Sequence, residues 1–128
     1  MNFINTRLAP QPAGHYSQAV VHNGMVYVSG QLPVKLDRLS SEVGTIEEQT
    51  SQVLHNIEQI LLAANSDKSK VVKVTVYISD ISLWGRVNEV YSHFFGNHKP
   101  ARTVVPTKEL HYGYQIEIEA IAALNSNK

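Results

Sequence analysis

Two glutamates and an arginine in the last third of the chain are the residues best suited by type and spacing to do chemistry. Glu117 and Glu119 stand two residues apart in an alternating run over 114–123, so on a strand both side chains leave the same face. Two buried carboxylates on one face need a cation nearby or a shifted proton affinity. Arg102, in a strand-like run over 102–105, supplies a cation whose planar fork can hold a substrate carboxylate bidentately. Arg102 and Glu119, expected on neighbouring strands, therefore form a candidate site.

Each of these residues also has a structural explanation. Arg102 can pair with an acid at a strand edge, and Glu119 can be an ordinary solvated acid on a half-polar strand. The sequence has no G-x-S-x-G, H-E-x-x-H or G-x-x-x-x-G-K motif, so the usual signatures of serine hydrolases, zinc proteases and phosphate-binding loops are missing. Its six histidines show no paired ligand spacing and it has no cysteine. We therefore predict no metal site.

Length and charge limit the classes of protein that remain. The chain has 128 residues, which predicts one domain over 1–128. Its formal net charge is zero at pH 7 and its charged residues are scattered, so it lacks the basic stripe typical of nucleic-acid-binding proteins. There is no signal-peptide pattern and no apolar run long enough to span a bilayer. These features predict a cytoplasmic protein that binds neither nucleic acid nor a membrane.

A hairpin is the first element with a clear signal. Strand-like runs over 16–21 and 25–29 are joined by a segment that contains Asn23-Gly24, and Asn-Gly favours a tight turn because both residues tolerate positive φ. Gly30 follows the second run, where a glycine lets a ligand or another backbone approach closely. The residues after it, as far as Gly44, lack a period and predict a loop.

Helical spacing and capping residues predict two helices. Thr45 and Glu48 form a capping box, and apolar residues then recur at helical spacing as far as Ala64. A second apolar face runs from Ser82 to Phe95, with Gly96 as a C-terminal stop. A β-branched strand over 71–79 lies between them.

The order of elements is hairpin, helix, strand, helix, strand, strand. Two strand-helix-strand crossovers and a hairpin predict an α+β fold, a mixed sheet with both helices packed on one face. The strand over 114–123 is expected to be central. The opposite face of the sheet then has no cover within the chain, and self-association is its simplest cover. The side chains expected there are Lys73, Thr75, Tyr77, Glu117, Glu119 and Ile121.

Five separated segments keep an order and spacing that resemble the signature of the RidA (YjgF) family. They are Gly14-His15-Tyr16-Ser17-Gln18-Ala19-Val20, Ser29-Gly30-Gln31-Leu32-Pro33, Val87-Asn88-Glu89-Val90-Tyr91, Lys99-Pro100-Ala101-Arg102 and Ile116-Glu117-Ile118-Glu119-Ala120-Ile121-Ala122. The resemblance covers nearly the whole chain. It implies a chorismate-mutase-like fold and a homotrimer with a central sheet barrel and three clefts between subunits.

The resemblance also implies an activity that needs no cofactor. This is hydrolysis of reactive enamines and imines, such as 2-aminoacrylate and related 2-imino acids, to 2-keto acids and ammonia. By position, Arg102 would clamp the substrate carboxylate and Glu119 would hold or protonate the attacking water. The residues that would shape the pocket are Tyr16, Ser29, Gly30 and Asn88. Such chemistry suits a chain without standard machinery, because an imine is already electrophilic and orientation with one proton-handling group is sufficient.

Three departures from the family pattern bear on specificity. His15 stands where many members have proline, Val104 where many have cysteine, and residues 110–114 read Leu-His-Tyr-Gly-Tyr where many members have Leu-Pro-Lys-Asp. Aromatic side chains near the cleft would alter which substrates fit. Two other functions stay open: a non-catalytic trimer that binds small carboxylates or a partner protein, and an endoribonuclease, against which the neutral charge argues.

Overall fold

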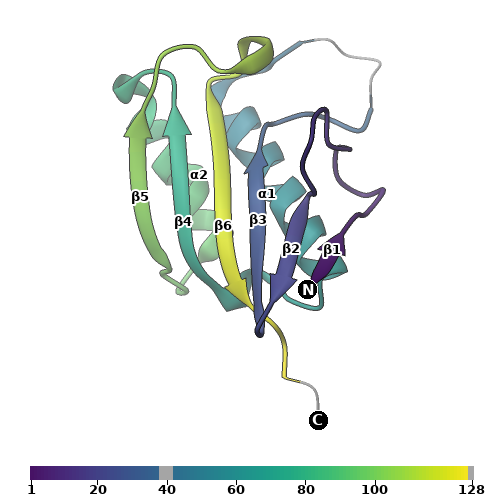
Figure 1. Ribbon diagram of the computed structural model, residues 1–128. Coiled ribbons are helices and arrows are strands. Elements are labelled where there is room, and N and C mark those ends of the chain that lie inside the picture. The colour runs from purple at the N-terminus through teal and green to yellow at the C-terminus, as the bar shows by residue number, and fades with distance from the viewer. Residues whose placement is uncertain (38–41, 127–128) are drawn as a thin grey trace.

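The computed structural model describes residues 1–37 and 42–126. Within these residues, six strands form one mixed sheet in the order β1-β2-β3-β6-β4-β5, and two long helices lie behind it on the same face (Figure 1). The predicted α+β architecture is therefore confirmed. The elements are β1 (Asn2–Ile4), β2 (Ala19–His22), β3 (Met25–Gln31), α1 (Ile46–Ala63), β4 (Val71–Ile78), α2 (Trp84–Phe95), β5 (Ala101–Pro106) and β6 (Ile116–Ala123), with short 3-10 helices η1 (Lys68–Lys70), η2 (Ile81–Leu83) and η3 (His111–Gly113). No helix among the described residues has the length and apolarity to cross a membrane.

The hairpin forms at the predicted turn. Asn23 and Gly24 both have positive φ, at 50° and 77°, which is the backbone that a two-residue turn between strands requires. β2 is shorter than predicted and begins at Ala19. The reason lies at Tyr16, whose N–H donates to the carbonyl of Gly14, so that the chain turns locally before it joins the sheet.

The capping box of α1 is present with both of its hydrogen bonds. Thr45 Oγ1 accepts from the N–H of Glu48 at 3.1 Å, and Glu48 Oε1 accepts from the N–H of Thr45 at 2.9 Å. The second predicted helix starts as η2 and becomes α-helical at Trp84. It ends at Gly96, where φ is 61°, as the C-terminal stop predicts. The apolar faces of both helices bury against the sheet.

β6 is a central strand, as expected from its sequence. It pairs antiparallel with β3 on one side and with β4 on the other. Ala120 aligns with Val74 on the buried helix side, whereas Glu119 aligns with Thr75 on the opposite face. Strict alternation along β4 predicts that Val72 shares the buried face of Val74, and this prediction is wrong: Val72 is exposed and Val71 is buried, because the register shifts between Val71 and Lys73.

The sheet face turned away from the helices has no cover from any described element (Figure 1). An apolar row crosses it at one level, since Phe3 aligns with Val20, Val20 with Tyr27, and Tyr27 with Ile121. Phe3 is 70% exposed. We call the sheet face turned away from the helices the open face. An apolar row with two exposed aromatic side chains, Phe3 and Tyr27, is a surface that favours association.

Candidate functional site

A pocket of about 1040 Å³ lies where three segments meet at one end of the sheet. Its walls come from the N-terminal segment before β2, from the end of β3 with the residues that follow, and from η3 with Tyr114. Of the predicted site residues, Tyr16 and Gly30 line it. Arg7 and Lys35 also line it, together with Asp37 and Glu42, so its lining carries both cations and acids. No group of three or more His, Asp or Glu side chains among the described residues could hold a metal ion.

Glu117 lies directly against Gly30. A Cβ at position 30 would overlap the carboxylate of Glu117, so the glycine is what allows this carboxylate to sit beside the pocket. Burial raises the pKa of Glu117, and the nearby Glu119 raises it further, while His111 acts in the opposite direction. A carboxyl group with a raised pKa keeps its proton to a higher pH than an ordinary glutamate, which suits it to proton transfer.

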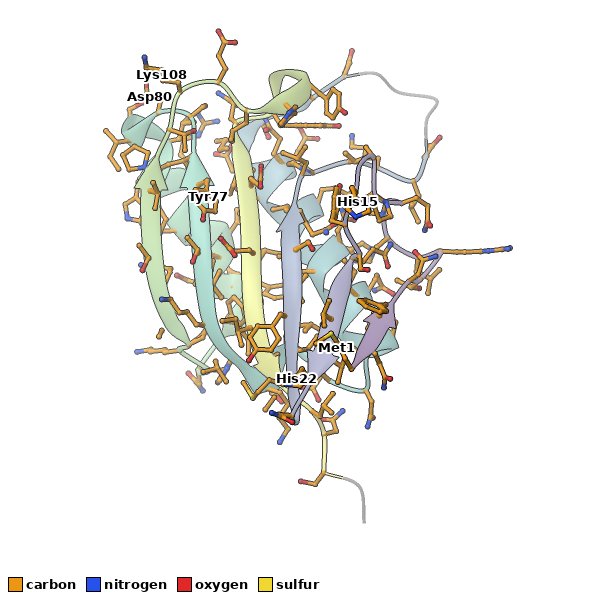
Figure 2. All side chains as sticks on the ribbon, in the orientation of Figure 1. Met1, His15, His22, Tyr77, Asp80 and Lys108 are labelled. Carbon is orange, nitrogen blue, oxygen red and sulfur yellow. The ribbon has the colours of Figure 1, made fainter. Side chains whose placement is uncertain are left out.

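Glu119 has a different environment on the same open face. The hydroxyl of Tyr77 donates to Glu119 Oε1 at 2.5 Å, and this hydrogen bond is the main reason that the pKa of Tyr77 is raised. Figure 2 shows Tyr77 on the side of the sheet turned toward the viewer, away from the helices. Glu119 therefore has a fixed partner, whereas Glu117 is the carboxyl next to the pocket lining.

Arg102 is held by three side chains of α2. Its guanidinium carbon lies 4.5 Å from the ring centre of Trp84 and 4.9 Å from that of Tyr91, and its Nη1 donates to Asn88 Oδ1 at 3.0 Å. Over residues 1–37 and 42–126 no carboxylate lies within ion-pair distance of Arg102. Neutral side chains thus position the guanidinium and leave some of its N–H donors available to a ligand. The alternative, a structural ion pair of Arg102 at the strand edge, is absent among the described residues.

Arg102 and Glu119 do not meet within one chain, so the prediction that they lie on neighbouring strands is wrong. β4 lies between β5 and β6. Arg102 aligns with Val74, which faces the helices, and Glu119 aligns with Thr75 on the open face. The two charged groups therefore leave opposite faces of the sheet. The error arose because β5 is an exposed edge strand without a regular burial pattern, so its sequence does not reveal which way Arg102 points.

The two other predicted pocket residues have structural hydrogen bonds. Ser29 donates from Oγ to the carbonyl of Ser17 at 2.6 Å and from its N–H to the carbonyl of Gln18 at 2.9 Å. It ties β3 to the segment that carries Tyr16. Asn88 touches Arg102, as described above. The structure thus places Tyr16 and Gly30 at the pocket with Ser29 tying their segments together, Asn88 and Arg102 on α2 and β5, and Glu119 apart from both groups beside Tyr77.

Buried amide side chains hold the walls of the pocket in place, and the sequence reasoning missed them. Gln18 bonds the N–H and carbonyl of Thr6. Asn56 Nδ2 donates to the carbonyls of Leu32 and Val34 at 3.1 and 3.0 Å. Gln49 accepts from the N–H of Gln115 and donates to its side chain. A signal existed for two of them, because positions 49 and 56 fall at helical spacing with the buried residues 53 and 60.

Comparison with known proteins gives one consistent family. The model of the family described as "Endoribonuclease L-PSP" matches residues 6–124. A 2-iminobutanoate/2-iminopropanoate deaminase of Rattus norvegicus is 43% identical over 121 residues, which cover 93% of this chain and 87% of the rat protein.

Two solved structures show the same fold at high similarity. A putative endoribonuclease from Thermotoga maritima superposes with a TM-score of 0.92 at 45% identity, covering 98% of this chain and 99% of its own. The structure of E. coli TdcF with bound serine has a TM-score of 0.91 at 34% identity and covers 98% of this chain and 100% of that protein.

Proposed function

Because this chain belongs to the endoribonuclease L-PSP (YjgF/RidA) family, we propose that it hydrolyses reactive 2-imino acids, and the enamines that give rise to them, to 2-keto acids and ammonia. The observation that carries this proposal is the pairing of two features: Arg102, a cradled guanidinium without an acidic partner among the described residues, and Glu117, a carboxyl group with a raised pKa beside the pocket. The name of the rat relative supports the reaction class.

The reaction needs a bound carboxylate, a water molecule and one group that moves protons. An enamine such as 2-aminoacrylate first becomes the imine when a proton moves from nitrogen to carbon 3. The oxygen of water then bonds to carbon 2, the electron pair of the C=N bond passes to nitrogen, and one proton of the water is lost from oxygen while nitrogen gains one, which gives a carbinolamine. Nitrogen then takes a second proton, the hydroxyl loses its remaining proton, and cleavage of the C–N bond releases ammonia and leaves the keto acid. Orientation of the imine accelerates a reaction that already proceeds in water.

Arg102 is proposed to bind the substrate carboxylate. The rings of Trp84 and Tyr91 and the carbonyl oxygen of the Asn88 side chain fix the plane of its guanidinium. A guanidinium whose orientation is already fixed loses less entropy when it accepts a carboxylate in a two-bond fork. Asn88 is thus proposed to act through Arg102.

For proton transfer, the observations favour Glu117 over the predicted Glu119. Burial already favours the neutral form of Glu117, so it can donate a proton to the imine nitrogen and take one back from water. Glu119 accepts a hydrogen bond from Tyr77. We propose that this pair fixes the strand beneath Glu117, and that Tyr16, Ser29 and Gly30 shape the wall around it.

We further propose that the site is completed by a second copy of the chain in a homotrimer. Arg102 and Glu117 leave opposite faces of one sheet, so one molecule cannot direct both at the same small substrate. β5 is an edge strand, and the open face carries an apolar row that includes the exposed rings of Phe3 and Tyr27. If the open face of one copy packs near the β5 edge of the next, Arg102 of one chain reaches the pocket of the other.

The first test is a coupled assay in which an amino-acid oxidase generates 2-imino acids and their decay is followed. We expect wild type to accelerate the decay and Arg102→Ala to abolish the acceleration. Glu117→Gln should lose more activity than Glu119→Gln, and the reverse order would return the proton-transfer role to Glu119. The matched control is Arg86→Ala, which removes an exposed arginine that pairs with Glu47. Full activity of Arg102→Ala would overturn the carboxylate assignment.

Complementation between variants tests the shared site directly. Arg102→Ala and Glu117→Gln, each inactive alone, are refolded together. If each site takes its arginine from one copy and its carboxyl from another, random mixing restores about a quarter of the wild-type rate. Sites built within single chains would show no recovery. Analytical ultracentrifugation of the same samples gives the number of copies.

A second candidate function is binding of small carboxylates without turnover. The observation that favours it is the serine bound to E. coli TdcF, a structural relative. Tight binding of 2-keto acids by calorimetry, together with no acceleration of any imine, would support this function over the deaminase. RNA cleavage, suggested by the family description, has weaker support because the net charge is zero.

A further inference from the structure

The η3 loop brings three aromatic rings to the pocket. The ring centre of Tyr112 lies 5.7 Å from that of His111 and 6.5 Å from that of Tyr114, the latter pair nearly perpendicular at 84°. All three side chains line the pocket. Tyr16 lines it from the N-terminal segment, so rings contribute to two of its walls. A further ring could pack against them in the tilted or edge-to-face arrangements that aromatic pairs favour.

The backbone at Tyr112 is strained. Its φ is 61° and its ψ is 22°, a conformation that bulky residues rarely adopt. The side chain is 68% exposed, so burial in the folded chain does little to offset this strain. Strained positions of this type cluster where a protein holds a ligand. A glycine would adopt this backbone conformation with less strain. The tyrosine ring at position 112 therefore does not contribute to folding in an evident way.

The loop is continuous with the reacting end of the pocket. Gly30 lines the pocket and contacts Glu117, and His111 acts electrostatically on that carboxyl group. A substrate whose imine carbon lay near Glu117 would have these rings within the same pocket. At about 1040 Å³, the space matches the upper end of pockets that hold drug-sized ligands. A three-carbon imino acid would leave most of it to water.

We propose that the η3 loop makes this protein selective for 2-imino acids with an aromatic side chain, whose ring packs between Tyr112 and Tyr16. This proposal rests on the proposed function, because it names the substrate class of the same site. Tyr112 is the specificity-determining residue. Its ring favours the aromatic substrate by direct contact, and an aliphatic side chain of similar length gains less from the same contact.

The test compares kcat/KM for the imines made by an amino-acid oxidase from phenylalanine, leucine and alanine. We expect the phenylalanine imine to exceed the alanine imine by at least about tenfold, equivalent to about 1.4 kcal/mol, and to exceed the leucine imine as well. Tyr112→Gly removes the ring and suits the positive φ, so it should fold and lower the phenylalanine-to-alanine ratio about tenfold. Tyr112→Phe should retain the ratio. Leu62→Ala, an exposed residue on α1 outside the pocket, is the control.

Three results would overturn the inference: a wild-type preference for the alanine imine, a ratio unchanged in Tyr112→Gly, or a leucine imine hydrolysed as well as the phenylalanine imine. Failure of the proposed function has a different signature, namely no acceleration of any imine. In that case calorimetry with phenylpyruvate and pyruvate tests the inference by itself. Tighter binding of phenylpyruvate than of pyruvate, lost in Tyr112→Gly, would support the inference. Equal binding of the two keto acids would refute it.

Discussion

Replacement of Gly30 by alanine tests whether the glycine exists to admit the Glu117 carboxylate. The φ of Gly30 is not positive, so an alanine can adopt its backbone conformation. The added methyl group would overlap the Glu117 carboxylate oxygen and approach its Cδ to 3.2 Å. The obstacle is therefore one side chain on β6, not the backbone.

The expected magnitudes follow from this geometry. Filling a packed position costs about 1–3 kcal/mol, and the end of a flexible glutamate can turn away, which places the cost near the lower limit. A Gly-to-Ala change at a compatible position stabilises the folded protein by about 0.4–1 kcal/mol, because it lowers the conformational entropy of the unfolded chain. Gly30→Ala should thus change the free energy of unfolding little. Activity should fall far more, because a displacement of about 1 Å at a catalytic group can cost on the order of 100-fold.

Urea denaturation and the imine-decay assay measure the two effects in a double-mutant cycle. In a Glu117→Ala background the methyl group meets no carboxylate, so Gly30→Ala should stabilise the protein by about 0.4–1 kcal/mol. In the wild-type background the gain should vanish. Activity of Gly30→Ala within twofold of wild type would show that the glycine is not needed to admit the Glu117 carboxylate. The same change in stability in both backgrounds would show this too.

Three further predictions follow from single contacts. Glu117→Gln should become more stable relative to wild type as pH rises from acid to neutral, because a raised pKa in the folded state means that wild type loses stability as its carboxyl ionises; a difference in melting temperature that stays the same at every pH would contradict this. Asn56→Ala should lower the free energy of unfolding by about 2–3 kcal/mol in urea titrations, since it removes the donor to two backbone carbonyls beside the pocket. Asn88→Asp should raise KM for imino acids about tenfold or more with a smaller change in kcat, because the new carboxylate would occupy the Arg102 guanidinium; an unchanged KM would show that Arg102 does not bind the substrate carboxylate.

Local signals in the sequence were sufficient for most of the fold. The Asn23-Gly24 turn and the Thr45 capping box each depend on a few adjacent residues, and both form as predicted. The central position of β6 was predicted from its β-branched residues, and its alternation indicated that one face is buried. In each case the information lay within one element.

The candidate site depends on relations between elements, and here the sequence was insufficient. The direction of Arg102 is set by the pairing of β5 with β4, and the exposed residues of β5 carry no burial pattern that could reveal it. The roles of the buried amides of Gln49 and Asn56 were also not predictable. A polar residue in the apolar stripe of a helix can be interpreted only when the carbonyls to which it donates have been located. Tyr112 likewise looks like an ordinary loop residue until its positive φ is seen.

The opposite directions of Arg102 and Glu117 also suggest why such a site would be divided between copies. Within one chain, a guanidinium near a carboxylate would form an ion pair, which lowers the pKa of the carboxyl and occupies the donors that a substrate needs. Here the sheet separates the two groups, so Arg102 keeps neutral neighbours and Glu117 keeps its raised pKa. Association through the open face would then bring Arg102 of one copy and Glu117 of another to opposite sides of a bound substrate. The substrate carboxylate would contact Arg102 and its imine would contact Glu117.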